Sequence, residues 1–165
     1  MFCPEYRFKE AFDLFNRMRV EKVELDKFVA ASMISACTEM GALMQGKWIH
    51  VYVERSGIEL DSKLATTIID MYCKCGCLEK AFQVFNGLSE KGVSSWNCIC
   101  MIGGLAMHGK GEDAIRFFRE MELEMVVPDG ITFVNVLAAC AHSGLLEKGR
   151  YYFRYMTEVH GVEPA

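Results

Sequence analysis

Cysteine and histidine have the richest chemistry available in this chain, and their spacing decides which chemistry is possible. The eight cysteines include no pair separated by two residues, the spacing that metal sites commonly use. Cys73, Cys75 and Cys77 alternate instead, and residues two apart on a helix point about 200° away from each other. Without a secretory signal, a disulfide framework is not expected either. We predict no metal and no cofactor, and expect the cysteines to pack as small apolar side chains.

Catalytic motifs do not occur in the sequence. None of the four histidines is followed two residues later by glutamate, the pattern of zinc-dependent deaminases. Neither a Gly-x-Ser-x-Gly motif nor a phosphate-binding loop is present. The chain is therefore predicted not to be an enzyme.

The composition indicates a folded domain. The chain has 165 residues, of which 52% are hydrophobic and 24% charged. Its longest apolar runs, 28–34 and 131–137, are far shorter than the roughly 20 residues of a membrane span, so we expect no membrane partner. The first residues resemble neither a signal peptide nor an organelle leader rich in Arg and Ser.

Three columns of marker residues recur along the chain. The first holds small residues spaced by 35, 35, 33 and 35 positions: Ala11, Gly46, Ala81, Ala114 and Gly149. The second holds ring-bearing residues four positions later: Phe15, His50, Phe85, Phe118 and Phe153. The third holds turn glycines spaced by 35, 33 and 35: Gly41, Gly76, Gly109 and Gly144. Such a period is typical of helical-repeat solenoids.

Each repeat predicts two helices. The first, as in 30–37 and 131–141, is apolar nearly all round and ends at its glycine, so the adjacent repeats must cover it on both sides. The second is amphipathic, with its small residue and its ring on one face. The β-branched stretch 66–69 alone would suggest a strand, but the repeat context favours a helix. We predict an all-α fold: a right-handed α-solenoid of helix–turn–helix repeats, about four full ones after a partial one.

Several segments between the markers resemble the pentatricopeptide repeat of plants. The resemblance is carried by Val-Ser-Ser-Trp-Asn at 93–97, by Glu-Asp-Ala-Ile-Arg-Phe-Phe-Arg-Glu-Met at 112–121 and by Val-Pro-Asp at 127–129. Residues 69–76 and 46–50 resemble the short and long variants of the subfamily that mixes repeat lengths. Tetratricopeptide repeats have a related architecture, but their Leu-Gly and Tyr spacing is absent.

The resemblance implies how the solenoid is divided. It places the second helix of a partial repeat at 1–26, a long repeat at 27–61, a short one at 62–92, a standard one with a two-residue insertion at 93–129 and a long one at 130–165. Neither end reads as a polar cap, so we expect the chain to be a segment of a longer array.

The resemblance also implies which residues read RNA. In this family one repeat reads about one base of single-stranded RNA, through a side chain early in the first helix and the last residue of the repeat. The implied pairs are Asn97 with Asp129, Thr66 with Gly92, Ala31 with Asp61, and Val134 with Ala165. Asp26 closes the partial repeat, and Phe28 and Ile131 are implied to stack against bases or to wedge between them.

The four pairs differ in what they offer a base. Asn97 with Asp129 is implied to favour uracil. Thr66 leans toward a purine, but Gly92 leaves it without a second polar partner. Ala31 and Val134 have no side-chain donor or acceptor, so little base discrimination is expected from their repeats.

Two alternatives stay open around the standard repeat. Asn97 and Asp129 are also favoured N-cap residues and could simply begin helices. In addition, Cys98, Ile99 and Cys100 stand where the family pattern has one residue. Either the first turn bulges and Asn97 keeps its place, or the helix stays regular and Ile99 faces the base. We expect Asn97 to keep its place, because it follows Trp96 in the usual order.

The implied function is sequence-specific binding of single-stranded RNA in a mitochondrion or chloroplast. The chain would belong to an RNA-processing or C-to-U RNA-editing specificity factor, with other editing or processing factors as partners. The alternative is a protein-interaction scaffold, which a net charge of −4 would suit. The first helices carry three lysines against two acids, so we expect RNA binding to be weak and sensitive to salt.

Overall fold

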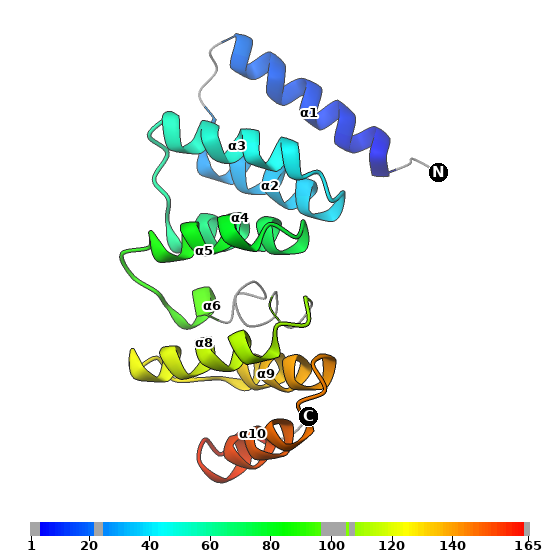
Figure 1. The fold of residues 1–165 in the computed structure, drawn as a ribbon. Coiled ribbons are helices and arrows are strands. Elements are labelled where there is room, and N and C mark those ends of the chain that lie inside the picture. Colours follow the sequence, from blue (N-terminus) through cyan, green and yellow to red (C-terminus); the bar gives the residue numbers. More distant parts are fainter. Residues whose placement is uncertain (1–3, 22–24, 97–104, 106–107, 164–165) are drawn as a thin grey trace.

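The protein is built from short helices joined by turns (Figure 1). The computed structural model describes residues 4–21, 25–96, 105 and 108–163. The helices are α1 (Pro4–Val20), α2 (Lys27–Glu39), α3 (Leu43–Arg55), α4 (Ser62–Lys74), α5 (Leu78–Asn86), α6 (Val93–Trp96), α8 (Gly111–Leu123), α9 (Gly130–His142) and α10 (Leu146–Glu158). Within these ranges there is no strand, and no helix is long and apolar enough to cross a bilayer. The predicted all-α fold is confirmed.

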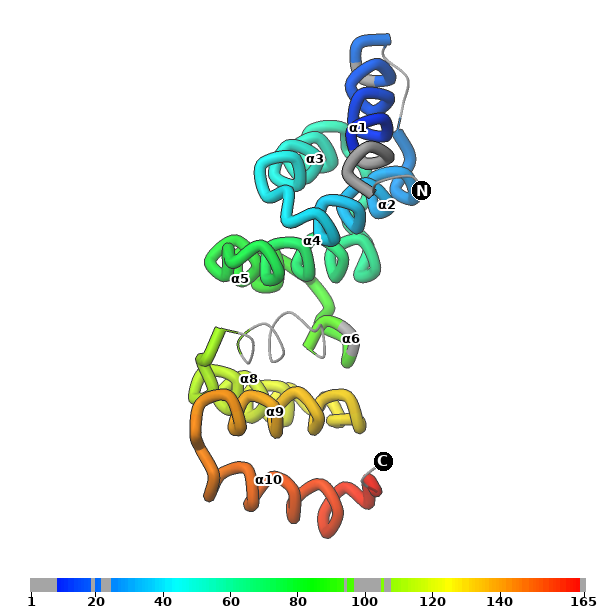
Figure 2. Tube along the Cα trace, turned by 90° about the vertical axis from the view of Figure 1, so that its right-hand side faces the viewer, coloured from blue at the N-terminus to red at the C-terminus, as the bar shows by residue number. Residues whose placement is uncertain are grey.

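The helices form pairs that stack on one another. Helix α2 packs against α3, α4 against α5, and α9 against α10, and each pair is joined by a short turn. Contacts between α2 and α4, and between α8 and α9, join one pair to the next. The pairs succeed one another along the molecule from α1 to α10, with α3 beside α2 and α5 beside α4 (Figure 2). This is the predicted helical-repeat solenoid.

The first helix of each pair ends at the glycine expected from the sequence. Gly41, Gly76 and Gly144 have φ values of 62°, 76° and 66°, a conformation that glycine adopts without the strain of a Cβ atom. The amide that follows the glycine then donates to a carbonyl five residues earlier, as in Leu145 N to Cys140 O at 2.8 Å. This Schellman geometry satisfies the end of the helix and turns the chain back.

The ring column lies in the core between neighbouring pairs. Phe15, Phe85 and Phe118 are 2%, 1% and 0% exposed, which confirms the packing role expected from the sequence. Phe153 differs, with 45% of its surface exposed, because within the described residues no helix beyond α10 covers that face. The core is therefore built from contacts between successive repeats.

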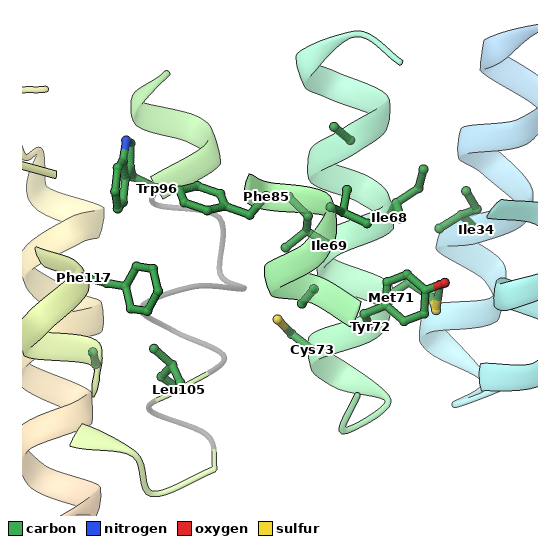
Figure 3. Packing of buried hydrophobic residues seen from close by; sticks show 14 of the residues in the cluster. Ile34, Ile68, Ile69, Met71, Tyr72, Cys73, Phe85, Trp96, Leu105 and Phe117 are labelled. Atoms are coloured by element: carbon green, nitrogen blue, oxygen red, sulfur yellow. The ribbon is translucent and has the colours of Figure 1, made fainter. Parts of the chain in front are cut away.

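Helix α4 shows how a first helix is covered from both sides. Its buried side chains, including Ile68, Ile69 and Tyr72, lie between Ile34 of α2 and the rings of Trp96 and Phe117 (Figure 3). Cys37, Cys73 and Cys140 are also buried, as free thiols. Burial raises the pKa of Cys37 to about 12, so this thiol stays protonated at neutral pH and packs as a small apolar group.

The small residues at the start of the second helices permit close helix contact. A Cβ atom added at Gly46 would lie 2.6 Å from Sδ of Met71, a flexible side chain of the next pair. One added at Gly111 would lie 2.8 Å from the backbone oxygen of Ala139 and 2.6 Å from Oγ of Ser143. The Gly111 amide donates to that same Oγ at 2.9 Å, so α8 and α9 are held together at this point.

Gly111→Ala should separate α8 from α9. We expect the free energy of unfolding to fall by about 1–3 kcal/mol, because backbone must move to admit the methyl group. Gly130→Ala is the matched control: Gly130 also begins a 13-residue helix, and its added Cβ would lie 3.7 Å from Val162. Urea unfolding followed by circular dichroism compares the two, and equal losses would contradict the close-contact explanation.

His50 is the one polar member of the ring column. Its Nδ1 lies 2.9 Å from the Tyr72 hydroxyl, and its Nε2 lies 3.6 Å from a carboxylate oxygen of Glu54. Burial lowers the pKa of His50; the charge of Glu54 opposes this effect and that of Lys80 adds to it. The imidazole is therefore held neutral between α3 and α4.

The free energy of unfolding should decrease as the pH falls below the ordinary histidine value of 6.5. In that window the unfolded chain takes up a proton at residue 50 while the folded chain does not, so acid favours unfolding. His50→Phe should flatten this dependence, although it also removes the partner of the Tyr72 hydroxyl. The comparison is therefore between slopes, from urea unfolding at about pH 7.5 and pH 5.5. Equal slopes in both proteins would refute the role of His50.

Candidate nucleic-acid interface

The exposed side of the first helices carries the residues that could meet RNA. Phe28 of α2 and Ile131 and Val134 of α9 are 65%, 58% and 64% exposed, so these apolar side chains are accessible to a ligand. Helices α2 and α4 border a cleft of mixed character lined by Lys27, Phe28, Ala31, Ser32, Ser35, Asp61, Lys63, Leu64 and Thr67. We call it the α2–α4 cleft. An aromatic ring can stack on a base of RNA, and lysines beside the ring can attract the RNA phosphates.

The acids expected to close the repeats lie at the starts of the next first helices. Asp26, Asp61 and Asp129 are the N-caps of α2, α4 and α9. Their Oδ1 atoms accept from the amides of Val29, Leu64 and Thr132, at 2.8, 2.8 and 2.9 Å. The capping alternative for Asp129 is thus confirmed. Capping by itself does not exclude a base-contacting role, because the capping bond engages Oδ1 in each of the three acids.

Asp129 is held more firmly than a simple cap requires. Its own amide donates to Thr132 Oγ1 at 3.1 Å, which completes a capping box, and the Thr132 hydroxyl also donates to Asp129 Oδ1 at 3.0 Å. Thr132 is fully buried. This network fixes the direction of the Asp129 carboxylate, which is what a base-reading group needs.

Asp61 has a second partner besides its cap. Lys27 Nζ donates to Asp61 Oδ2 at 2.7 Å, which links the start of α2 to the start of α4. The hydrogen bond and charge of Asp61 raise the pKa of Lys27. In turn, the hydrogen bond from Lys27, followed by that from the Leu64 amide, lowers the pKa of Asp61. Both side chains are partly exposed, so solvent screens the pair and it contributes little to stability.

The other predicted pairs are only partly placed. Thr66 is half-buried on α4, and Gly92 is exposed just before α6, where its carbonyl accepts from the Ser95 amide at 2.9 Å. Asn97 and Ala165 lie outside the described residues, as do Cys98, Ile99 and Cys100. The choice between Asn97 and Ile99 therefore stays a prediction. Trp96, immediately before them, is 1% exposed, with its ring 4.8 Å from that of Phe85.

Sequence reasoning overlooked part of the α2–α4 cleft. Lys27 and Lys63 entered the sequence analysis only in the count of charges on the first helices, whereas both line the cleft beside Asp61. A signal was available for Lys27: it precedes Ala31 by four residues, so the two share a face of α2. The contact with Asp61 depends on how α2 and α4 stack, which no single helix pattern contains.

The repeats match a known family. The profile of the PPR repeat matches residues 1–23, 65–93, 95–125 and 131–159. This chain belongs to the pentatricopeptide repeat family. The PPR profile leaves residues 24–64 uncovered, yet α2 and α3 form the same kind of hairpin there.

Curated relatives support the assignment along nearly the whole chain. A pentatricopeptide repeat-containing protein of Arabidopsis thaliana is 48% identical over 139 residues, 84% of this chain and 25% of its own length. The Arabidopsis chloroplastic protein ELI1 is 44% identical, covering 93% of this chain and 24% of its own length. A mitochondrial Arabidopsis PPR protein is 41% identical over 98% of this chain and 24% of its length. The chain thus spans about a quarter of these relatives.

Solved PPR structures have the same fold. The PPR protein PPR10, crystallised with an 18-nucleotide psaJ RNA element, superposes with a TM-score of 0.79 at 23% identity, over 92% of this chain and 22% of that one. The PPR domain of Arabidopsis protein-only RNase P 1, solved with tRNA, gives 0.76 at 15% identity, over 99% and 87%. At these identities the likeness establishes the solenoid fold.

Replacing Asp129 separates capping from any other role of its carboxylate. Asp129→Ala should lower the free energy of unfolding by about 0.5–2 kcal/mol, because the first turn of α9 loses its acceptor. Asp129→Ser keeps an N-cap oxygen without the charge and should stay close to the wild type. Thermal unfolding of the three proteins measures this. A loss as large in the Ser variant as in the Ala variant would show that capping is not what stabilises α9.

Proposed function

We propose that this chain binds single-stranded RNA along the exposed side of its first helices, with each repeat facing about one base. The observation that carries the proposal is the α2–α4 cleft. It brings together Phe28, Ala31 and Asp61, three residues to which the family resemblance assigns base contact, although they are up to 33 positions apart in sequence. PPR10 and the PPR domain of RNase P 1, whose fold this chain shares, were both solved with RNA.

The proposed repeats are those the sequence suggested: 27–61, 62–92, 93–129 and 130–165, after a partial one at 1–26. Helices α2, α4, α6 and α9 begin at Lys27, Ser62, Val93 and Gly130, which supports this division. Unequal lengths, and the stretch 24–64 that the PPR profile leaves uncovered, support the subfamily of mixed repeat lengths.

The proposed chemistry divides recognition between stacking, hydrogen bonding and charge. Exposed Phe28 and Ile131 lie against base faces, where every base offers the same π-surface. Asn97 and Asp129 present an amide and a carboxylate to one base edge and favour uracil, whereas Thr66, with Gly92 behind it, favours purines weakly. Lys63, exposed in the α2–α4 cleft, attracts the phosphates.

We further propose that the chain guides an organellar RNA-processing or C-to-U editing factor. Relatives named chloroplastic and mitochondrial support an organelle. In this role the chain selects the RNA, while chemistry belongs to another domain or to a partner factor.

Protein binding is a second candidate, favoured by the outer face of α3. Met44 and Trp48 are 62% and 57% exposed there and line a mostly apolar cleft with Val51, Tyr52 and Arg55. At the equivalent positions α5 carries Glu79 and Gln83, and α8 carries Glu112 and Arg116. Stacking of the repeats therefore does not require an apolar surface at this point.

Fluorescence anisotropy with short uridine-containing RNAs at two salt concentrations tests RNA binding. We expect affinity to be weak and to fall as salt increases, because salt screens the attraction between the lysines and the phosphates. Asn97→Ala and Asp129→Ser should each reduce the preference for uracil at one position about tenfold, within the range of a lost base-edge contact.

Trp48→Gln is the control for this experiment, since it changes the outer face of α3 and leaves the α2–α4 cleft intact. It should bind RNA like the wild type. If affinity is independent of salt and is unchanged by the Asn97 and Asp129 variants, the RNA proposal is wrong. The α3 face is then the surface to pursue.

A further inference from the structure

Lys27 occupies a place that no other described repeat fills with a long cation. It is the first residue of α2, whereas α4, α6 and α9 begin with Ser62, Val93 and Gly130. Because Lys27 and Ala31 are four residues apart, the lysine stem runs along the face that carries the proposed base-reading position of its repeat. Its ammonium ends on Asp61, the acid that closes the same repeat.

The Asp61 carboxylate is consequently engaged at both oxygens. Oδ1 accepts from the Leu64 amide at 2.8 Å, and Oδ2 accepts from Lys27 Nζ at 2.7 Å. The Lys27 ammonium also lies 5.8 Å from the centroid of the Phe28 ring, so it is held between the acid and the exposed aromatic side chain. All four residues line one cleft.

We infer that Lys27 is a specificity-suppressing residue, which closes the base-reading position of the 27–61 repeat by holding Asp61. This inference rests on the RNA-binding function proposed above. A base offers only neutral N–H donors to Asp61, and these are weaker partners for a carboxylate than an ammonium group. The repeat therefore binds RNA through Phe28 and Lys63 without selecting a base.

Either the apolar Ala31 or the contact of Lys27 with Asp61 could keep the 27–61 repeat from selecting a base, and the two explanations predict different results. If the apolar Ala31 alone were responsible, then Ala31→Asn would recreate the Asn and Asp combination of the 93–129 repeat and would be sufficient. If Lys27 also blocks Asp61, the new asparagine gains its partner only when the lysine is removed. The equivalent start of the 93–129 repeat is occupied by Val93, which carries no charge.

The test compares four full-length proteins: wild type, Ala31→Asn, Ala31→Asn with Lys27→Met, and Ala31→Asn with Lys63→Met. Methionine retains the apolar stem of lysine, so the stacking of α2 on α4 is preserved. Lys63→Met removes the same charge from the same cleft without touching the Asp61 side-chain contact. RNAs that bind each protein are first enriched from a pool of randomised single-stranded RNA. Fluorescence anisotropy then measures the affinity of each protein for the enriched RNA and for its single-base variants.

We expect the Lys27→Met double variant alone to select uracil at one additional position, by about fivefold to tenfold. Ala31→Asn and the Lys63→Met double variant should stay below about twofold at that position. The inference is overturned if Ala31→Asn alone selects uracil as strongly as the Lys27→Met double variant does. It is also overturned if the Lys27→Met double variant gains no selection while uracil is still selected at the position read by Asn97 and Asp129. If the wild type itself binds no RNA, the proposed function fails and the inference falls with it.

Discussion

The structure depends on one constraint: each first helix is apolar on nearly every side and has to be covered by neighbours on both. Helix α4 meets this requirement by lying between α2 and the aromatic side chains around Trp96 and Phe117. The close approach at Gly46 and Gly111 and the buried ring column follow from it, because both serve the contact between one pair and the next. Stability is therefore a property of interfaces between repeats more than of any single repeat.

The same constraint places the polar residues to which we assign RNA recognition in the proposed function. Once the flanks of a first helix are buried, its start and one narrow face remain in contact with solvent. The closing acids Asp26, Asp61 and Asp129 lie at those starts and cap the helices. A residue that caps a helix is held rigidly, so the proposed reading group is preorganised by an interaction the fold already needs. If these acids read RNA as proposed, affinity and stability are coupled at their positions, and only substitutions that preserve the cap can separate them.

Much of this organisation could be predicted from the sequence, because it depends on residue types that recur at a regular spacing within each repeat. The small residues, rings and turn glycines give the repeat, the helix ends and the core column, and the acids before α2, α4 and α9 give the caps of these three helices. The Lys27–Asp61 contact could not be predicted in this way, since it joins residues 34 positions apart through the stacking angle of α2 on α4. The exposure of Phe153 was missed for the same reason: its column predicts a ring in the core, but only a neighbouring helix can bury it.

Several contacts between repeats join residues about one repeat apart along the chain. Lys27 with Asp61, His108 with Cys73 and Tyr155 with Glu122 are 34, 35 and 33 positions apart. A chain whose tertiary contacts span about one repeat or less has low contact order for its length, and such chains close their loops at little entropic cost and fold fast. Folding can therefore start at any interface and spread in both directions. Because the Lys27–Asp61 bond itself spans such an interface, it forms only when that growth passes through α2 and α4.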